Sequence, residues 1–364
     1  MERTFRVVGI MSGTSMDGVD LALCHLAGNG DAWTYRIEAA ETIPYEEKWR
    51  VRLSQLQYQS ALLYAKTDVF YGRYLGELVK QFLLKHGAQA DLVASHGHTV
   101  FHDPDGWITA QIGCGQTLSA FCGLPVVSDF RRMDVASGGQ GAPLAGIGDE
   151  LLFSDYDFCL NLGGFCNISG TYGNTRVAYD IAPCNIVLNR LAREAGQKYD
   201  EGGAIAAQGS IHYELQNRLE HIDYYHRPFP KSLSREWINK EFWHIVRDYD
   251  GFPTADRMKT LVNHIAGQIS RNIEALCDGA SEGKRVLVTG GGAFNHTLIE
   301  FLRSETDAEI VVPDSHLVNF KEALIFALLG AMRLCNLNNV RGEYTGARQD
   351  QCTGALHGDF SNLI

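Results

Sequence analysis

Residues 13–20 combine the small, hydroxyl and carboxylate side chains that commonly surround a bound phosphate. The segment consists of Gly13, Thr14, Ser15, Met16, Asp17, Gly18, Val19 and Asp20. Glycines let a ligand approach the backbone closely, so that N–H groups and hydroxyls can converge on an anion. Asp17 and Asp20 could hold a hydrated Mg²⁺, which binds through one or two carboxylates plus phosphate oxygens. A tight hairpin turn that simply needs glycine is the alternative, and the segment alone leaves both open.

A second glycine group, Gly290, Gly291 and Gly292, follows an apolar stretch and precedes a predicted helix. Glycines leave room for a nucleotide against the backbone, and a helix N-terminus favours phosphate. Neither the spacing G-x-G-x-x-G nor the pattern G-x-x-x-x-G-K-[ST] is present. The group therefore indicates either a nucleotide contact or a crowded strand-to-helix turn.

Two carboxylates stand at positions with both a chemical and a structural interpretation. Asp180 ends a predicted strand, where it could act as a general base or cap the helix predicted from Pro183. Glu322 follows Asn319 by three residues, which is the spacing of a capping box. By itself, that spacing favours a structural role for Glu322.

Three histidines, an aspartate and an arginine could form a polar wall. His96, His98, His102 and Asp103 have the spacing H-x-H-x-x-x-H-D, which permits a metal site but lacks an identifiable downstream partner set. A wall for a polar substrate fits better. Arg131 could clamp a carboxylate or phosphate bidentately, or form an ordinary surface ion pair.

The elements that would position these residues occur twice. Predicted strands cover residues 6–10, 19–26 and 33–42, and again 157–162, 165–170 and 175–179. In both sets a glycine-containing loop joins the first two strands, and helical material follows the third. This repetition predicts an internal duplication of an α/β unit.

Composition narrows the class of partner and the compartment. The chain has 364 residues, enough for two domains, and a net charge of −11 without a long basic cluster. We therefore expect neither nucleic acid nor an anionic membrane surface as a partner. No apolar run reaches the roughly 18 residues of a membrane span, and the strand entered by Phe5 argues against a signal peptide. Nine dispersed cysteines are typical of reduced thiols, which predicts a cytoplasmic protein.

An ordered set of motifs resembles the anhydro-N-acetylmuramic acid kinases, a family within the larger group of sugar kinases, actin and Hsp70 ATPases. The motifs are Gly-Ile-Met-Ser-Gly-Thr-Ser-Met-Asp-Gly-Val-Asp (9–20), Ser-His-Gly-His-Thr-Val (95–100), Asp-Phe-Arg (129–131), Gly-Gly-Gln-Gly-Ala-Pro-Leu (138–144), Asn-Leu-Gly-Gly (161–164) and Gly-Gly-Gly-Ala (290–293). They are spread over nearly the whole chain.

The resemblance implies an α/β fold of two duplicated RNase H-like domains, the actin-like ATPase fold, around an interdomain cleft. We expect the first domain over residues 1–130 with the C-terminal tail from about 340 to 364, and the second over residues 131–339. ATP would be held by residues 13–20 and by Gly290, Gly291 and Gly292. Mg²⁺ would lie at Asp17 and Asp20, beside the phosphates.

The resemblance also implies a reaction and a set of sugar contacts. Asp180 would be the catalytic base that activates water to open the 1,6-anhydro ring of the amino sugar. The oxygen released at C6 would take the γ-phosphoryl group of ATP, giving N-acetylmuramic acid 6-phosphate in the recycling of cell-wall murein. The residues facing the sugar would be His98, Thr99, Arg131 and Glu322. The family further implies a homodimer.

The sequence departs from the family pattern on the proposed sugar side. Ile181-Ala182 replace Thr-Gly after the aspartate, His98 replaces Gln, and Leu233-Ser234 replace Thr-Gly. These substitutions bear on which anhydro sugar is used. Ile181 and Ala182 also motivate the hypothesis of an ATP- and sugar-binding sensor without catalysis. Separately, His96, His98 and His102 motivate the hypothesis of a metal-dependent hydrolase.

Overall fold

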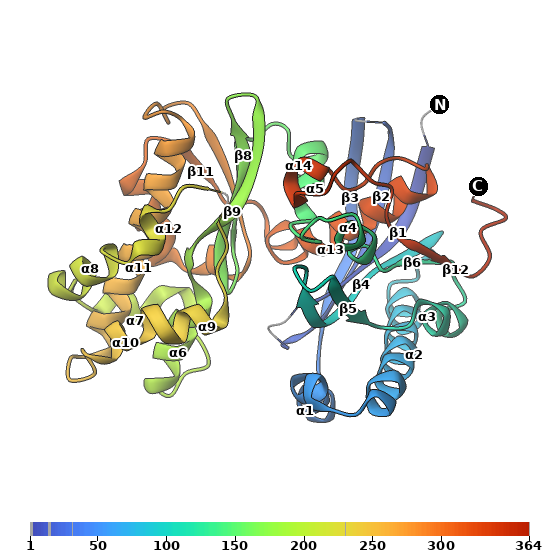
Figure 1. Cartoon of the computed structure of the whole chain (residues 1–364), viewed down its shortest axis with the longest axis horizontal. Coiled ribbons are helices and arrows are strands. Elements are labelled where there is room, and N and C mark those ends of the chain that lie inside the picture. Colours follow the sequence, from blue (N-terminus) through green and yellow to red (C-terminus); the bar gives the residue numbers. More distant parts are fainter. Residues whose placement is uncertain (1–2, 14–15, 31, 230, 364) are drawn as a thin grey trace. The chain divides into compact units, whose positions relative to one another are not determined.

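The computed structural model describes residues 3–13, 16–30, 32–229 and 231–363. The chain divides into two compact units (Figure 1). The first unit comprises residues 1–153 and 320–364, and the second comprises residues 154–319.

The first unit is built on a mixed seven-stranded sheet. β1 (Arg3–Ser12), β2 (Gly18–Asn29) and β3 (Ala32–Pro44) form an antiparallel meander. β4 (Leu92–Asp103) lies parallel to β1, and β6 (Val126–Ser128) lies parallel to β4. β5 (Ile108–Ile112) pairs with the far end of β4, and β12 (Ala355–His357) closes the edge beside β6. The strand order is β12-β6-β4-β1-β2-β3.

Alternating residues of β1 face different layers, as the pleat of a strand requires. Val8 and Ile10 are fully buried in a core that includes Tyr71, Leu75 and Phe82 of one long helix. The helices of this unit are α1 (Glu47–Gln55), η1 (Leu56–Tyr58), α2 (Ala61–Lys85), α3 (Gly115–Cys122), α4 (Arg132–Ala136), α5 (Ala145–Leu152), the greater part of α13 (Ser315–Leu334) and α14 (Gly342–Thr345).

Gly9 of β1 makes a close contact with α13. A Cβ atom at Gly9 would lie 1.9 Å from the carbonyl oxygen of Ala323. Glycine therefore allows this helix to pack directly against the central strand.

The second unit repeats the architecture with five strands. β7 (Phe158–Leu162), β8 (Phe165–Tyr172) and β9 (Thr175–Pro183) form the meander. β10 (Arg285–Thr289) is parallel to β7, and β11 (Glu309–Val311) is parallel to β10. The order β11-β10-β7-β8-β9 corresponds strand by strand to β6-β4-β1-β2-β3 of the first unit. The parallel and antiparallel pairings also correspond. The predicted duplication is therefore confirmed.

A long amphipathic helix, α11 (Thr254–Leu276), forms the centre of the second unit's core. Its buried side chains include Leu261, Ile265, Ile269 and Ile273. The remaining helical segments are α6 (Asn185–Glu194), η2 (Glu201–Gly203), α7 (Ala204–Gln208), α8 (Tyr213–Glu220), η3 (Asp223–His226), α9 (Arg235–Trp237), η4 (Ile238–Phe242), α10 (Trp243–Arg247), η5 (Gly291–Phe294) and α12 (His296–Glu305).

The limits of the two units differ from the predicted domain limits at residues 130 and 339. Residues 131–153 and 320–339 belong to the first unit. Long-range packing accounts for the difference. Ala323 contacts β1, and Phe153 packs edge-on against Tyr35 of β3 with ring centroids 5.5 Å apart.

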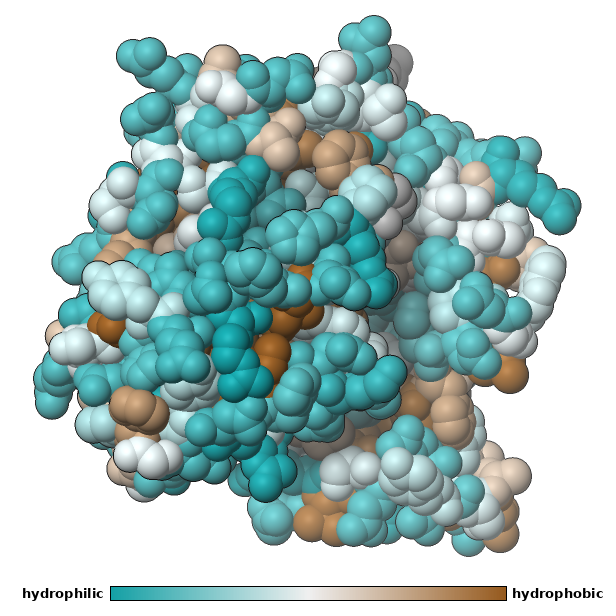
Figure 2. Space-filling view, turned by 60° about the vertical axis from the view of Figure 1, so that its left-hand side comes forward, coloured by the Kyte–Doolittle hydropathy of each residue, from teal (hydrophilic) through white to brown (hydrophobic). Residues whose placement is uncertain are grey.

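Hydrophilic side chains predominate on the face of the molecule drawn in Figure 2. Within the part of the chain that the structure describes, no helix is both long and apolar enough to cross a bilayer.

Candidate active site

The glycine- and hydroxyl-rich segment forms the connection between β1 and β2. Thr14 and Ser15 lie outside the described residues. On either side of them, Met16 has a positive φ of 59° and its amide donates to the carbonyl of Gly13 at 3.4 Å. The hydroxyl of Ser12, which is buried, donates to the carbonyl of Gly97 at 2.8 Å and ties this connection to β4.

The two aspartates of this connection are electrostatically coupled. Asp20 accepts a hydrogen bond from the Thr42 hydroxyl at 2.6 Å. Burial raises the pKa of Asp20, the Thr42 hydrogen bond opposes this rise, and the negative charge of Asp17 adds to it. A divalent cation would relieve the repulsion between the two carboxylates, so these residues fit a Mg²⁺ that also contacts phosphate oxygens.

His96 holds the guanidinium group of Arg131 in place. Arg131 Nε donates to His96 Nε2 at 2.8 Å, and Arg131 Nη1 donates to the carbonyl of Gly141 at 2.5 Å. The other ring nitrogen of His96, Nδ1, lies 2.9 Å from the carbonyl oxygen of Gly97. Burial lowers the pKa of Arg131 to about 10, and nearby carboxylates, Glu322 first, act in the opposite direction. Arg131 is therefore a positioned cation at neutral pH.

The metal interpretation of the histidines finds no support. Both ring nitrogens of His96 already have partners, and His102 Nδ1 lies 3.0 Å from the hydroxyl of Thr109. Among the described residues there is no group of three or more His, Cys, Asp or Glu side chains that could hold a metal ion. Strand β4 runs through all three histidines to Asp103, and β5 pairs with this part of it.

His98 and Thr99 lie side by side in β4 but differ in exposure. His98 is only 1% exposed, and burial lowers its pKa to about 4, so the ring is neutral at pH 7. Its Nδ1 atom is buried without a hydrogen-bond partner among the described residues. Thr99 is half-buried, and its hydroxyl accepts a hydrogen bond from Gln111 at 3.3 Å.

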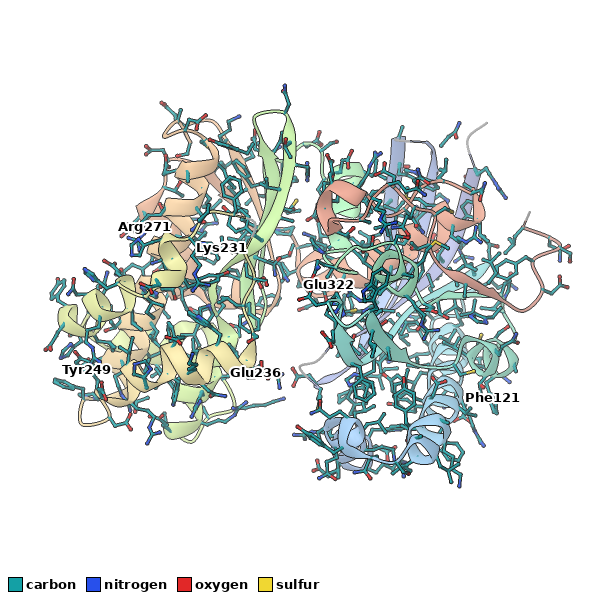
Figure 3. All side chains as sticks on the ribbon, in the orientation of Figure 1. Phe121, Lys231, Glu236, Tyr249, Arg271 and Glu322 are labelled. Atoms are coloured by element: carbon teal, nitrogen blue, oxygen red, sulfur yellow. The ribbon has the colours of Figure 1, made fainter. Side chains whose placement is uncertain are left out.

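The capping-box interpretation of Glu322 is wrong. Helix α13 begins at Ser315, four residues before Asn319, and the side chain of Asp314 accepts the amide hydrogen of Leu317 at 2.9 Å. Glu322, which Figure 3 labels, therefore lies inside the helix. Because Glu322 contributes to the electrostatics of Arg131, the structure brings these two predicted substrate residues together in the first unit.

In the second unit, Asp180 is anchored by a segment about 50 residues further along the chain. Its amide donates to the carbonyl of Lys231 at 3.0 Å, and its carboxylate Oδ2 accepts from the amide of Leu233 at 2.9 Å. Its carbonyl accepts from the hydroxyl of Tyr224 at 2.7 Å. Burial raises the pKa of Asp180 and the Leu233 amide partly offsets this rise. A positioned carboxylate with a raised pKa suits a general base.

Asp180 is not a helix cap. Strand β9 continues to Pro183, and Cys184 occupies the N-cap position of α6. The alternative interpretation of Asp180 as an N-cap is therefore wrong.

The three glycines after β10 differ in their surroundings. Gly290 has a φ of 81°, and a Cβ there would lie 2.4 Å from Asn161 Oδ1. A Cβ at Gly292 would lie 2.7 Å from Leu162 Cβ. The turn is crowded at these two positions, whereas a Cβ at Gly291 would meet nothing closer than 3.7 Å. The backbone is therefore open to a ligand at Gly291.

The family departures beside Asp180 lie in the core of the second unit. Ile181 and Ala182 are both fully buried in its hydrophobic cluster. Leu233 anchors Asp180 through its backbone amide, and Ser234 caps α9 by accepting from the amide of Trp237 at 3.2 Å. In this chain these four residues therefore serve packing, capping and, at Leu233, a backbone hydrogen bond to Asp180.

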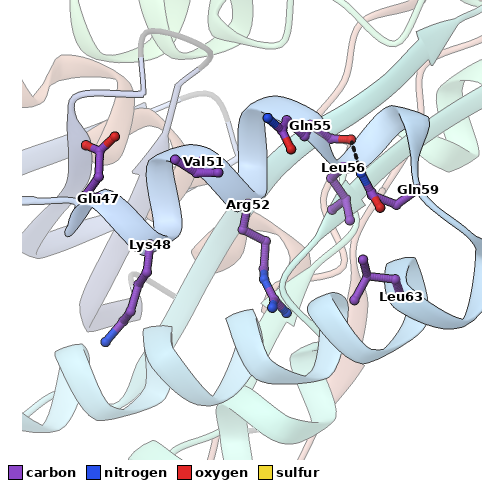
Figure 4. Close-up of a pocket in the computed structure, with 8 residues that line it drawn as sticks. All are labelled: Glu47, Lys48, Val51, Arg52, Gln55, Leu56, Gln59 and Leu63. Carbon is purple, nitrogen blue, oxygen red and sulfur yellow. Dashed lines mark hydrogen bonds between the residues drawn. The ribbon is translucent and has the colours of Figure 1, made fainter.

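A cavity of about 430 Å³ in the first unit lies away from this chemistry (Figure 4). It is formed by α1, η1 and the start of α2, where Gln59 donates to the carbonyl of Gln55 at 3.4 Å. None of the predicted site residues lines it.

The duplicated strand order is that of an actin-like ATPase fold, the class that includes sugar kinases. A family model described as anhydro-N-acetylmuramic acid kinase matches residues 5–359. The chain belongs to this family and is therefore a kinase, a phosphotransferase with an alcohol group as acceptor.

Relatives named anhydro-N-acetylmuramic acid kinase match almost end to end. The proteins of Legionella pneumophila (strain Paris) and Vibrio vulnificus (strain CMCP6) are each 32% identical, with 96% of this chain and 97% of the relative covered. The protein of Synechococcus elongatus is 33% identical, with 94% and 96% covered. Among solved structures, the activator of 2-hydroxyisocaproyl-CoA dehydratase from Clostridium difficile with bound ADPNP is similar at 13% identity and a TM-score of 0.44, over 89% of this chain and 94% of that chain.

Proposed function

We propose that this kinase opens 1,6-anhydro-N-acetylmuramic acid with water and phosphorylates the oxygen released at C6. The product is N-acetylmuramic acid 6-phosphate, and the reaction consumes one ATP and one water for each sugar. The observation that carries the proposal is the anchoring of Asp180 by three hydrogen bonds with Tyr224, Lys231 and Leu233. Such anchoring holds the carboxylate ready to accept a proton from the attacking water.

ATP is proposed to bind the β1–β2 connection and the open backbone at Gly291. Mg²⁺ supplies positive charge at the phosphates when bound, and Asp17 and Asp20 are the residues that would hold it. Arg131, supported by His96, is proposed to bind the sugar together with Glu322, His98 and Thr99. Activity in the cytoplasm and assembly as a homodimer stay predictions.

The structure gives no support to the hypothesis of a sensor without catalysis. It rested on Ile181 and Ala182, and both side chains are buried in the core. The three hydrogen bonds that anchor Asp180 are made with Tyr224, Lys231 and Leu233, and none of them uses the side chain of residue 181 or 182. We therefore favour catalysis.

The test measures ADP release from purified protein with ATP, Mg²⁺ and 1,6-anhydro-N-acetylmuramic acid, and the mass of the sugar product. The expected product has gained one phosphate and one water. Asp180→Asn should retain nucleotide binding while its rate falls by about 10²–10⁴-fold, the usual contribution of a general base. The matched control is Asp223→Asn, which changes an exposed aspartate of η3 and should leave the rate unchanged.

Two results would contradict the proposal. A product that gains phosphate without water would mean that the ring is not opened hydrolytically. Turnover by Asp180→Asn within tenfold of the unmodified protein would remove Asp180 from the role of base.

A further inference from the structure

A cavity of about 460 Å³ in the second unit is lined by three cationic side chains. It lies between the end of α8, residues 225–229 with Lys231, and the C-terminal half of α11. The cations are Arg227, Lys231 and Arg271 (Figure 3 labels the last two). In a chain of net charge −11, this is a local concentration of positive charge.

The positive charge of the cavity is largely uncompensated. Glu220 is the one carboxylate in the lining, and it lies 3.7 Å from Arg271. Within the described residues, Arg227 and Lys231 have no carboxylate partner within 4.0 Å. Lys231 Nζ donates a hydrogen bond of 3.3 Å to the carbonyl of Tyr224. Burial lowers the pKa of Lys231, and the nearby positive charge of Arg227 lowers it further. An anion between these side chains would be attracted by all three.

Aromatic residues form the rest of the wall. The hydroxyl of Tyr225 is buried and has no hydrogen-bond partner among the described residues. Phe229 stacks on Tyr179 with ring centroids 5.1 Å apart and an interplanar angle of 8°. The cavity therefore offers an apolar ring beside its cations.

The cavity is separate from the carboxylate of Asp180. Successive side chains of a strand point to opposite faces of the sheet, so Tyr179 and Asp180 face different sides. Tyr179 faces α11, where its hydroxyl donates to Asn272 at 3.1 Å, and Asn272 lines the cavity. The cavity lies on this face, away from the proposed base.

We propose that this cavity binds a phosphate monoester of a small polar molecule. The lining holds three cations and one carboxylate, so its charge suits a doubly charged ligand better than a ligand with a single negative charge. Arginine guanidinium groups also bind phosphate bidentately. The volume lies within the usual range for small-molecule sites, roughly 300–1,000 Å³. The ring of Phe229, which lines the cavity, would contact the esterified group. This site goes beyond the proposed kinase reaction and does not depend on it.

Calorimetric titration with glucose 6-phosphate as the probe tests the proposal. A non-hydrolysable ATP analogue and Mg²⁺ are kept saturating, so that the proposed nucleotide site is already filled. We expect saturable binding that weakens at least tenfold in both Arg227→Gln and Arg271→Gln. Both side chains are exposed, so the substitutions should preserve the fold. Lys259→Gln, on the same helix but about 18 Å from Arg271, is the matched control and should bind like the unmodified protein.

Two further ligands identify the bound chemistry. Glucose should not bind, because it carries no charge, and inorganic phosphate should bind more weakly than the ester, because it cannot contact the aromatic wall. Absence of saturable binding, or binding unchanged in both arginine variants, would overturn the site. Inorganic phosphate binding as tightly as glucose 6-phosphate would overturn its assignment to a monoester. Because the readout is binding, these outcomes are independent of whether the kinase reaction occurs.

Discussion

Replacing Tyr224 by phenylalanine should slow the reaction although Tyr224 does not touch the reacting atoms. The substitution removes only the hydroxyl that donates to the carbonyl of Asp180 at 2.7 Å. A neutral hydrogen bond contributes about 0.5–1.5 kcal/mol net. If that contribution serves to hold Asp180 in the transition state, kcat should fall by about 2- to 13-fold.

A double-mutant cycle separates positioning from general stability. In the Asp180→Asn background there is no base left to position, so Tyr224→Phe should have little further effect on the rate. The assay is ADP release at saturating ATP and sugar, measured for both single variants and the double variant. Tyr213→Phe, which changes a tyrosine that is 79% exposed, is the control and should be neutral. An equal proportional loss in both backgrounds would refute the reasoning, because it would show that Tyr224 acts independently of Asp180.

Three further perturbations have definite expected outcomes. Gly9→Ala should lower the free energy of unfolding by about 1–3 kcal/mol, because its Cβ would meet the Ala323 carbonyl at 1.9 Å. Gly251→Ala is the control, because a Cβ there meets no atom within 4 Å, and thermal unfolding of both variants measures the difference. Burial lowers the pKa of His98 to about 4, so the ring is already neutral at pH 5 and above. His98→Gln should therefore leave the shape of the pH–rate profile between pH 5 and 8 unchanged, and loss of an inflection in that range would contradict this. Chelation of divalent cations should abolish phosphoryl transfer, and added Mg²⁺ should restore it. Asp20→Asn should need a higher Mg²⁺ concentration for half-maximal rate than the unmodified protein. The same Mg²⁺ concentration in both proteins would argue against Asp20 as a ligand.

The strands and their glycine turns could be predicted because each carries its signal locally. The strands of both meanders are short apolar runs separated by glycine-containing turns, so each is visible in its own few residues, and the repeated pattern predicts the duplication. The motifs spread along the chain indicated the family for the same reason. Each needs only its own few residues to be recognised.

The support of Asp180 could not be predicted, because it comes from distant backbone groups. The amide of Leu233 and the carbonyl of Lys231 are present in any residue, so no pattern of side-chain types marks them. The aromatic residues Tyr224, Tyr225 and Phe229 have no sequence period that would relate them to β9. Its contact depends on the chain folding back across about 44 residues.

The capping box at Asn319 predicted the wrong start for α13, for a different physical reason. Two capping signals lie within one helical segment, Asp314 before Ser315 and Asn319 before Glu322. Either is acceptable locally. Burial of Leu317 and Val318 favours the longer helix, and this burial depends on tertiary packing that a short window of sequence does not contain.

The split of the first unit bears on the order in which the chain can fold as it is synthesised. Residues 154–319 are continuous, so all strands of the second unit are available as soon as residue 319 has left the ribosome. The first unit must wait for residues 320–364, which supply most of α13 and the edge strand β12. The N-terminal half therefore emerges first but is completed last, contrary to the usual N-terminal-first order of multidomain proteins. During that interval the sheet face around Gly9 lacks its covering helix, and nascent chains halted before residue 320 should expose it to chaperones and proteases.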